Sequence, residues 1–169
     1  MTAPRARAAY GHEAVDRLIS EVIGAVGTDD NDDLVRSLLV TALDMDSADV
    51  DRLELKIASQ SLVEMLAAWR VFSPWNDNAK ATIFGSARTK PDHPDYALAS
   101  ETGRLLAERG WMAITGAGPG IMTAGLEGAG KENAFGVNIV LPFEQAANEA
   151  IGDDKLATFR YFFTRKLTF

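Results

Sequence analysis

The sequence has 169 residues, among which there is no cysteine and only two histidines, His12 and His93. The lack of cysteine excludes disulfide bonds and thiolate metal ligands. Two histidines are too few for a histidine-based metal centre. We therefore expect no metal site, and no pattern in the chain indicates a cofactor.

Long apolar runs are lacking as well, although hydrophobic residues make up 47% of the chain and can form a core. No run approaches the roughly 20 residues of a membrane-spanning helix. Arg5 and Arg7 are not followed by the apolar segment of a secretory signal. The net charge is −7 without a basic stripe, which is unfavourable for binding nucleic acid. We expect a cytoplasmic protein that binds neither membranes nor nucleic acid.

Glycine is concentrated in residues 115–123, which read TGAGPGIMT. The apolar run 111–114 before this stretch predicts a buried strand, and the apolar spacing after it predicts a helix. A strand, a glycine loop and a helix present unpaired backbone N–H groups to an anion. Pro119 suits the first helical position, because its missing N–H would be unpaired there anyway. We predict that a phosphate binds the amides of residues 117–121.

Other phosphate-binding patterns do not fit this loop. A dinucleotide fingerprint, G-x-G-x-x-G, requires glycine at position 121, which is Ile121. The next predicted strand, residues 134–141, ends without the carboxylate that would bind a ribose. No Lys-Ser or Lys-Thr pair follows the glycines, which excludes a Walker A loop. A strand-to-helix turn without a ligand stays open as the simpler interpretation.

The chain divides into two parts by pattern. Residues 1–75 predict a helical N-terminal extension, and residues 76–169 predict a nucleotide-binding domain. The expected elements of the second part are strands at 81–84, 111–114 and 134–141, a helix at 94–109, and a helix that follows the glycine loop and runs to residue 130. Residues 144–154 read as a polar loop or short helix, and residues 157–169 are aromatic-rich. The fold class is α/β, a Rossmann-like parallel β-α-β-α-β sheet with helices on both faces.

Three motifs in this order resemble the LOG (LONELY GUY) family, often labelled "lysine decarboxylase": IFGSAR at 83–88, TGAGPGIM at 115–122 and FTRK at 163–166. The resemblance covers about residues 78–169. It implies a nucleoside 5′-monophosphate phosphoribohydrolase, which cleaves AMP or a cytokinin riboside monophosphate into free base and ribose 5-phosphate. It also implies a homo-oligomer, as a homodimer.

The resemblance assigns roles to individual residues. Arg165 would be the catalytic arginine, beside the phosphate or the leaving base. The residues implied to bind substrate are Gly85, Ser86, Gly116, Gly118, Pro119, Gly120, Ile121 and Lys166. By spacing alone, Arg165 would be a solvated helix charge and Ser86 part of an ordinary strand-end turn. Glu144 and Asn148 could face the base, although a polar surface loop is the favoured interpretation.

One departure from the family limits the expected activity. Members carry a further motif, P-G-G-x-G-T-x-x-E, whose glutamate is catalytic, and the 169 residues end before such a motif. We therefore expect hydrolysis from a chain that includes the motif and none from these residues alone. Two alternatives stay open, a non-catalytic nucleotide-binding or sensing module and an inactive scaffold fragment. The sequence indicates neither the base preference nor the role of the helical extension.

Overall fold

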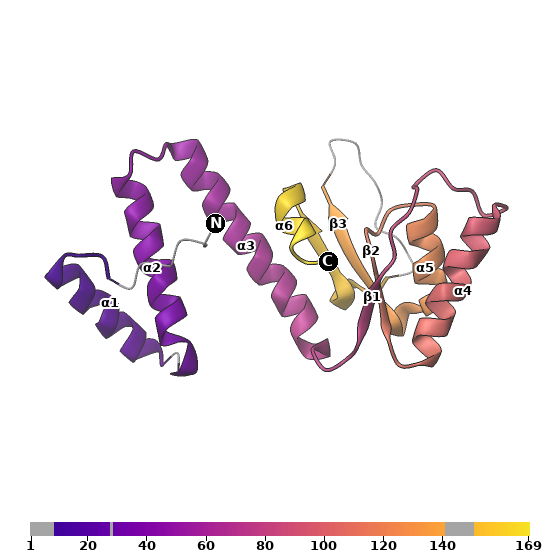
Figure 1. The fold of residues 1–169 in the computed structure, drawn as a ribbon, viewed down its shortest axis with the longest axis horizontal. Coiled ribbons are helices and arrows are strands. Elements are labelled where there is room, and N and C mark those ends of the chain that lie inside the picture. The colour runs from indigo at the N-terminus through magenta and orange to yellow at the C-terminus, as the bar shows by residue number, and fades with distance from the viewer. Residues whose placement is uncertain (1–8, 28, 141–150) are drawn as a thin grey trace, which may run out of the picture. The chain divides into compact units, whose positions relative to one another are not determined.

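Figure 1 shows the computed structural model, which describes residues 9–27, 29–140 and 151–169. The chain divides into two compact units, residues 1–59 and residues 60–169. We call them the helical unit and the sheet unit and describe each by itself. Among the helices described, none is both long enough and apolar enough to cross a membrane.

The helical unit contains α1 (Glu13–Val26), the short 3-10 turn η1 (Asp29–Asn31), α2 (Asp32–Ser47) and the start of α3 (Arg52–Phe72). Its small core consists of Ile19 and Ile23 of α1 packed with Val40 of α2. Gly27 ends α1 with φ +68°, a conformation that favours glycine. This unit shows the amphipathic helices that the sequence predicts.

The sheet unit is built on four parallel strands in the spatial order β1-β2-β3-β4. The strands are β1 (Lys80–Thr82), β2 (Met112–Thr115), β3 (Ala134–Ile139) and β4 (Leu156–Phe159). The helices are α4 (Pro94–Glu108), α5 (Ile121–Ala129) and α6 (Phe162–Lys166), and the 3-10 turns are η2 (Ser73–Trp75), η3 (Lys131–Asn133) and η4 (Asp153–Lys155). A parallel sheet with helices and an N-terminal helical segment confirms the predicted α/β class, consistent with a Rossmann-like fold.

Helices cover both faces of the sheet within this unit (Figure 1). On one face, Phe135 and Val137 of β3 pack with Ala68 and Phe72 from the second half of α3. The Phe72 and Phe135 rings stack with their centroids 4.6 Å apart. On the other face, Leu126 of α5 packs with Ala134 of β3. Because both faces are covered, β2 is buried along its whole length, as is typical of a parallel strand.

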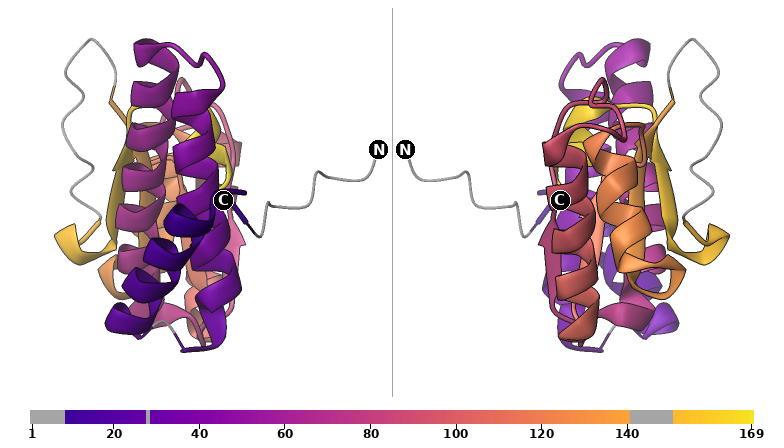
Figure 2. Two further views of the ribbon diagram at one scale, coloured as in Figure 1. Left: turned by 90° about the vertical axis from the view of Figure 1, so that its left-hand side faces the viewer. Right: turned by 90° about the vertical axis from the view of Figure 1, so that its right-hand side faces the viewer.

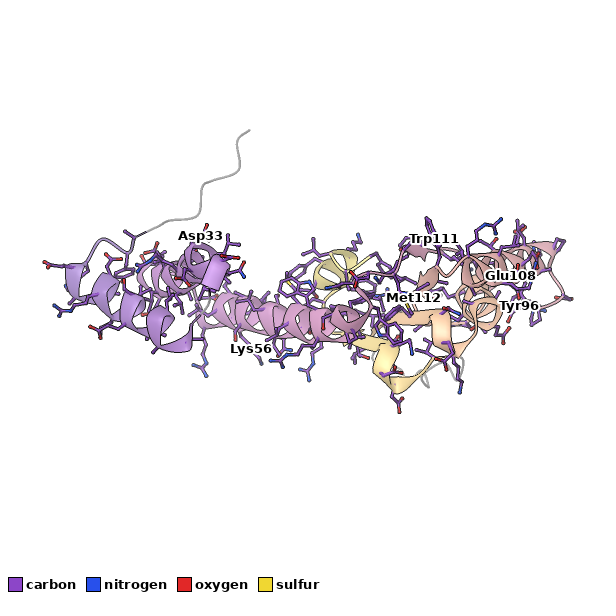
Figure 3. All side chains as sticks on the ribbon, turned by 90° about the horizontal axis from the view of Figure 1, so that it is seen from below. Asp33, Lys56, Tyr96, Glu108, Trp111 and Met112 are labelled. Atoms are coloured by element: carbon purple, nitrogen blue, oxygen red, sulfur yellow. The ribbon has the colours of Figure 1, made fainter. Side chains whose placement is uncertain are left out.

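The change from surface to core at the start of β2 is abrupt. Trp111 lies at the surface, whereas its neighbour Met112 points into the core and is 1% exposed (Figure 3). The predicted strand 111–114 is thus shifted by one residue, because backbone pairing with β1 begins at Met112.

Glycines allow α4 and α5 to lie against each other, as the right-hand view of Figure 2 shows. A Cβ at Gly128 would overlap the carbonyl oxygen of Ser100, and one at Gly103 would overlap that of Gly125. Backbone therefore packs on backbone at this helix pair. Tyr96 of α4 also donates a hydrogen bond to Glu127 of α5 over 2.8 Å.

The structure differs from the sequence-based expectation at several elements. The aromatic-rich segment 157–169 holds β4 and α6, neither of which was predicted. The third strand ends at Ile139, and the first begins one residue earlier than predicted and ends at Thr82. Pro119 is not at the first helical position, because α5 begins at Ile121. The loop prediction for 144–154 falls mostly on residues 141–150, which lie outside the described residues.

The division into units also bears on the expected domains. Residues 60–72 of α3 belong to the sheet unit, which therefore begins before the expected boundary between residues 75 and 76. Their inward side packs on the sheet through Ala68, Val71 and Phe72. The division into a helical extension of residues 1–75 and a nucleotide-binding domain of residues 76–169 stays a prediction.

Replacing Gly128 by alanine should force α4 and α5 apart. We expect the free energy of unfolding of the sheet unit to fall by about 1–3 kcal/mol, the usual cost of overpacking. Urea unfolding followed by tryptophan fluorescence measures this unit selectively, because Trp69, Trp75 and Trp111 all lie in it. Gly24→Ala is the control, since a Cβ there meets nothing within 4 Å. An equal stability of Gly128→Ala and the parent protein would contradict the close packing.

The Tyr96–Glu127 hydrogen bond should be visible in the pH dependence of stability. Burial, and then the hydrogen bond to Glu127, raises the pKa of Tyr96 from 10.0 to about 12. A raised pKa means that the protonated phenol stabilises the folded state below pH 10 and that this contribution is lost towards pH 12. Near pH 8, we expect the free energy of unfolding of the parent protein to be about 1 kcal/mol higher than that of Tyr96→Phe. In urea titrations the difference should shrink above pH 10, and a constant difference would argue against the interaction.

Candidate functional site

The candidate site lies where β1, β2 and β3 end, because loops at the carboxyl ends of parallel strands meet at one edge of a sheet. Two loops are central there. We call residues 84–88 the serine loop and residues 116–120 the glycine loop. The N–H of Ile83, just before the serine loop, still donates to Ile114 of β2, which holds the two loops next to each other.

The two loops are joined by backbone contacts. The N–H of Ile121 donates to the carbonyl of Ser86 over 3.1 Å. Gly120 has φ +69°, and a Cβ on it would overlap the Ser86 carbonyl oxygen. Glycine at position 120 is therefore needed both for its conformation and for the approach of the serine loop.

Two of the amides predicted to bind phosphate are already engaged. The N–H of Ala117 donates to the buried Thr115 Oγ1 over 3.1 Å, and that of Ile121 donates to Ser86. Fewer backbone N–H groups of residues 117–121 are therefore available to a phosphate than the sequence predicts. Of the hydrogen bonds formed by described residues, none uses the N–H of Gly118, Gly120 or Met122. These three groups are the donors left at the start of α5.

The side chain of Arg165, on α6, contacts the backbone just after β2 and within β3. Its Nε donates to the carbonyl of Val137 in β3 over 2.7 Å, and its Nη2 donates to the carbonyl of Gly116 over 3.1 Å. Its Cζ lies 5.4 Å from the centre of the Phe169 ring. A Cβ at Gly116 would overlap Nη2, so glycine there makes room for the guanidinium.

The charge of Arg165 is only partly exposed to solvent. Burial lowers the pKa of its guanidinium from the ordinary value. Within the described part of the chain, no carboxylate forms an ion pair with it. A half-buried cation without an anionic partner favours the binding of an anion.

Arg165 lines a cleft of about 230 Å³, which we call the arginine cleft. Its lining combines loop backbone, one guanidinium, one amide and several apolar side chains: Ala87, Gly116, Gly118, Pro119, Met122, Asn138, Ile139, Phe162 and Arg165. None of these residues is acidic. The cleft can therefore bind and orient an anionic molecule, but the described residues of its lining supply no carboxylate for acid–base chemistry.

A second hollow of about 350 Å³ lies between the serine loop and α4. Its lining is mostly apolar with a few polar groups: Ile83, Phe84, Gly85, Ser86, Thr89, Asp95, Leu98, Ala99, Thr102 and Ile121. The Ser86 hydroxyl accepts a hydrogen bond from the N–H of Arg88 over 3.1 Å and keeps its own proton for donation.

The structure divides the predicted site residues between these two places. Gly116, Gly118, Pro119 and Arg165 line the arginine cleft, and Gly85, Ser86 and Ile121 line the second hollow. Gly120 joins the two loops. Lys166 is exposed and lines neither. Glu144 and Asn148 lie outside the described residues.

Two further residues were missed by the sequence analysis. Asn138 lines the arginine cleft, and its Oδ1 accepts the N–H of Ile139 over 2.9 Å. An amide near the carboxyl end of an apolar strand was the signal that could have found it. Glu64 of α3 is buried and contacts the chain just before Arg165. Its helical spacing is ordinary, and no sequence pattern marks it.

In residues 9–27, 29–140 and 151–169, no three His, Asp or Glu side chains are grouped so as to hold a metal ion.

In a comparison with protein-family models, residues 78–158 match the model of the SLOG cluster4 family. The match is consistent with the SLOG superfamily, which includes the LOG proteins. It spans β1 to β4 and both loops of the site, although it ends before Arg165. A comparison with curated proteins found no match. The match supports similarity to a nucleotide-related superfamily, which is a broader group than the LOG family that the motifs resemble.

The contact between Gly116 and Arg165 can be tested without a ligand. We expect the Nε–H of Arg165 to give a resonance protected from exchange in a ¹H–¹⁵N spectrum, because it donates to a buried strand carbonyl. Gly116→Ala should shift this resonance and remove its protection, since a Cβ there displaces Nη2. Arg165→Lys identifies the signal by abolishing it.

Gly118→Ala is the matched control for that experiment. A Cβ at position 118 meets the mobile end of Met122, whose Cε would be 2.7 Å away and can move. The Arg165 resonance should therefore stay in place. If Gly116→Ala and Gly118→Ala left it equally unchanged, the close approach of Arg165 to Gly116 would be disproved.

Proposed function

We propose that the sheet unit binds a nucleoside 5′-monophosphate in the arginine cleft. The observation that carries the proposal is the half-buried guanidinium of Arg165, which has no carboxylate partner among the described residues. It lies beside Gly118 and Met122, whose N–H groups are available at the start of α5. A cation and backbone N–H groups together suit a phosphate.

The size of the cleft limits what it can enclose. Its volume of about 230 Å³ is below the roughly 300–1,000 Å³ usual for small-molecule sites. We infer that it holds part of the nucleotide and that the rest extends beyond it. Met122, Ile139 and Phe162 offer apolar surface for a ribose or base edge.

We further propose phosphoribohydrolase activity of the LOG type for a chain that joins this cleft to a catalytic carboxylate. Cleavage of the base–ribose bond builds positive charge at C1′, which a carboxylate stabilises while water attacks. Among the residues that the structure describes, none that lines the arginine cleft is acidic. The cleft would contribute by binding the phosphate, because a fixed phosphate holds the base–ribose bond in one orientation for the reaction. The glutamate of a P-G-G-x-G-T-x-x-E motif would supply the missing group.

A second candidate is a nucleotide-binding or sensing module without catalysis, which would need only the cation and N–H groups that the described lining of the cleft supplies. This candidate predicts AMP binding with no adenine release, even when the motif is appended. The phosphoribohydrolase proposal predicts adenine release once the motif is present. The homo-oligomer implied by the resemblance stays a prediction in both cases.

The experiment is a calorimetric titration of the 169-residue chain with AMP, adenosine and inorganic phosphate. We expect AMP to bind most tightly, and Arg165→Ala to weaken AMP about tenfold or more, because a hydrogen bond to a charged group contributes about 1.5–3 kcal/mol. Arg165→Lys should be intermediate, since lysine keeps the charge but loses the planar fork.

Lys131→Ala is the matched control, because like Arg165→Ala it removes one positive charge from the sheet unit. Lys131 is exposed and is not among the residues that line the arginine cleft. The affinity of Lys131→Ala for AMP should equal that of the parent chain. Equal binding of AMP and adenosine, or wild-type affinity in Arg165→Ala, would refute the proposed site. Free adenine is measured in parallel, with the 169-residue chain and with the chain extended through the motif.

A further inference from the structure

A buried carboxylate from α3 lies next to the helix that carries Arg165. Glu64 belongs to the sheet unit and is 5% exposed. Neither Glu64 nor Arg165 is part of the segment 78–158 matched by the family model. The proposal on the arginine cleft makes no use of this carboxylate.

The partners of Glu64 all come from the junction between β4 and α6. Its Oε1 accepts the N–H of Arg160 over 3.0 Å, and its Oε2 accepts the N–H of Tyr161 over 3.4 Å. Its Oε2 also lies 2.8 Å from Oγ1 of the buried Thr164. Three donors from one short segment thus converge on one side chain, and every one of them can donate to a carboxylate.

Burying a carboxylate is costly unless its oxygens are satisfied. Among the ion pairs of described residues, none includes Glu64, so no lysine or arginine balances its charge. The backbone N–H groups and the Thr164 hydroxyl replace the water that the carboxylate loses. Removing any of these contacts leaves the others to carry a buried charge.

The same segment determines where Arg165 lies. The helix α6 has only 5 residues, far fewer than an isolated helix needs for stability. Arg165 follows Thr164 directly, and its N–H donates to the carbonyl of Tyr161 over 3.2 Å. Both of these neighbours contact Glu64. The carboxylate therefore fixes the backbone on which the guanidinium is mounted.

We propose that Glu64 is a positioning residue, which holds the start of α6 so that Arg165 reaches the carbonyls of Gly116 and Val137 in the arginine cleft. What the cleft binds rests on the proposed function, but the positioning of Arg165 does not. Glu64 does not line the cleft and makes no contact with its contents. Its effect passes through Tyr161 and Thr164.

The first measurement follows the Arg165 Nε–H resonance, whose position and exchange report the contact with Val137. Glu64→Ala should shift the resonance and speed its exchange at least tenfold, and Glu64→Gln, which keeps one acceptor oxygen, should have a smaller effect. Thr164→Val should also shift it, because the hydroxyl contact is lost.

Ala68→Gly is the matched control for loss of stability. Ala68 lies on the same helix, is 1% exposed and packs with core residues of the sheet strands. It should lower the melting temperature while leaving the Arg165 resonance unchanged. An Arg165 resonance that stays fixed in folded Glu64→Ala and Glu64→Gln would overturn the proposal. If Glu64→Ala does not fold, Glu64→Gln and Thr164→Val decide the question in the same way.

The second measurement is the affinity of the same variants for AMP. We expect Glu64→Ala to weaken AMP about tenfold, Glu64→Gln less, and Ala68→Gly not at all. Wild-type affinity in variants with a displaced Arg165 would refute the link between position and binding. If the parent chain does not bind AMP, the proposed function fails, and the Arg165 resonance still decides whether Glu64 positions the guanidinium.

Discussion

The site depends on the two hydrogen bonds that Arg165 donates, one to the carbonyl of Gly116 just after β2 and one to the carbonyl of Val137 within β3. These bonds engage Nε and Nη2 of the guanidinium and hold the group at the lining of the arginine cleft. Strand-end carbonyls carry partial negative charge, but they do not neutralise a full cation. Because burial disfavours the charged form of Arg165, an anion that enters the cleft would relieve an existing electrostatic cost.

The glycine loop owes much of its composition to packing within the protein. Gly116 makes room for the guanidinium, and Gly120 makes room for the Ser86 carbonyl. A loop of the same spacing could thus arise without a ligand. What distinguishes this loop is its combination with Arg165 and with free N–H groups at the start of α5. The motif is better understood as a scaffold for the arginine than as a phosphate cradle alone.

The sequence predicted the parts of the fold that are locally encoded. The apolar run 111–114 predicted β2 within one residue, and the glycines after Thr115 predicted the turn into α5, although this helix begins at Ile121 rather than at Pro119. The strand β4 was missed because it has four residues, one of which is exposed, between a polar turn and an aromatic segment. The role of Glu64 could not be predicted, because its partners lie 96 to 100 positions later in the chain. Arg165 was identified through the resemblance, since its spacing alone indicates a surface charge.

The central claim is that the Arg165 guanidinium meets a nucleotide phosphate in this cleft. A titration of the ¹⁵N-labelled chain with AMP, followed by the Arg165 Nε–H and by the amides of Gly118 and Met122, tests it most directly. The account requires that these signals shift together and saturate at one AMP concentration, while adenosine leaves the Arg165 signal in place. Saturable binding of AMP that moves only signals elsewhere in the chain, or no binding at all, would contradict it.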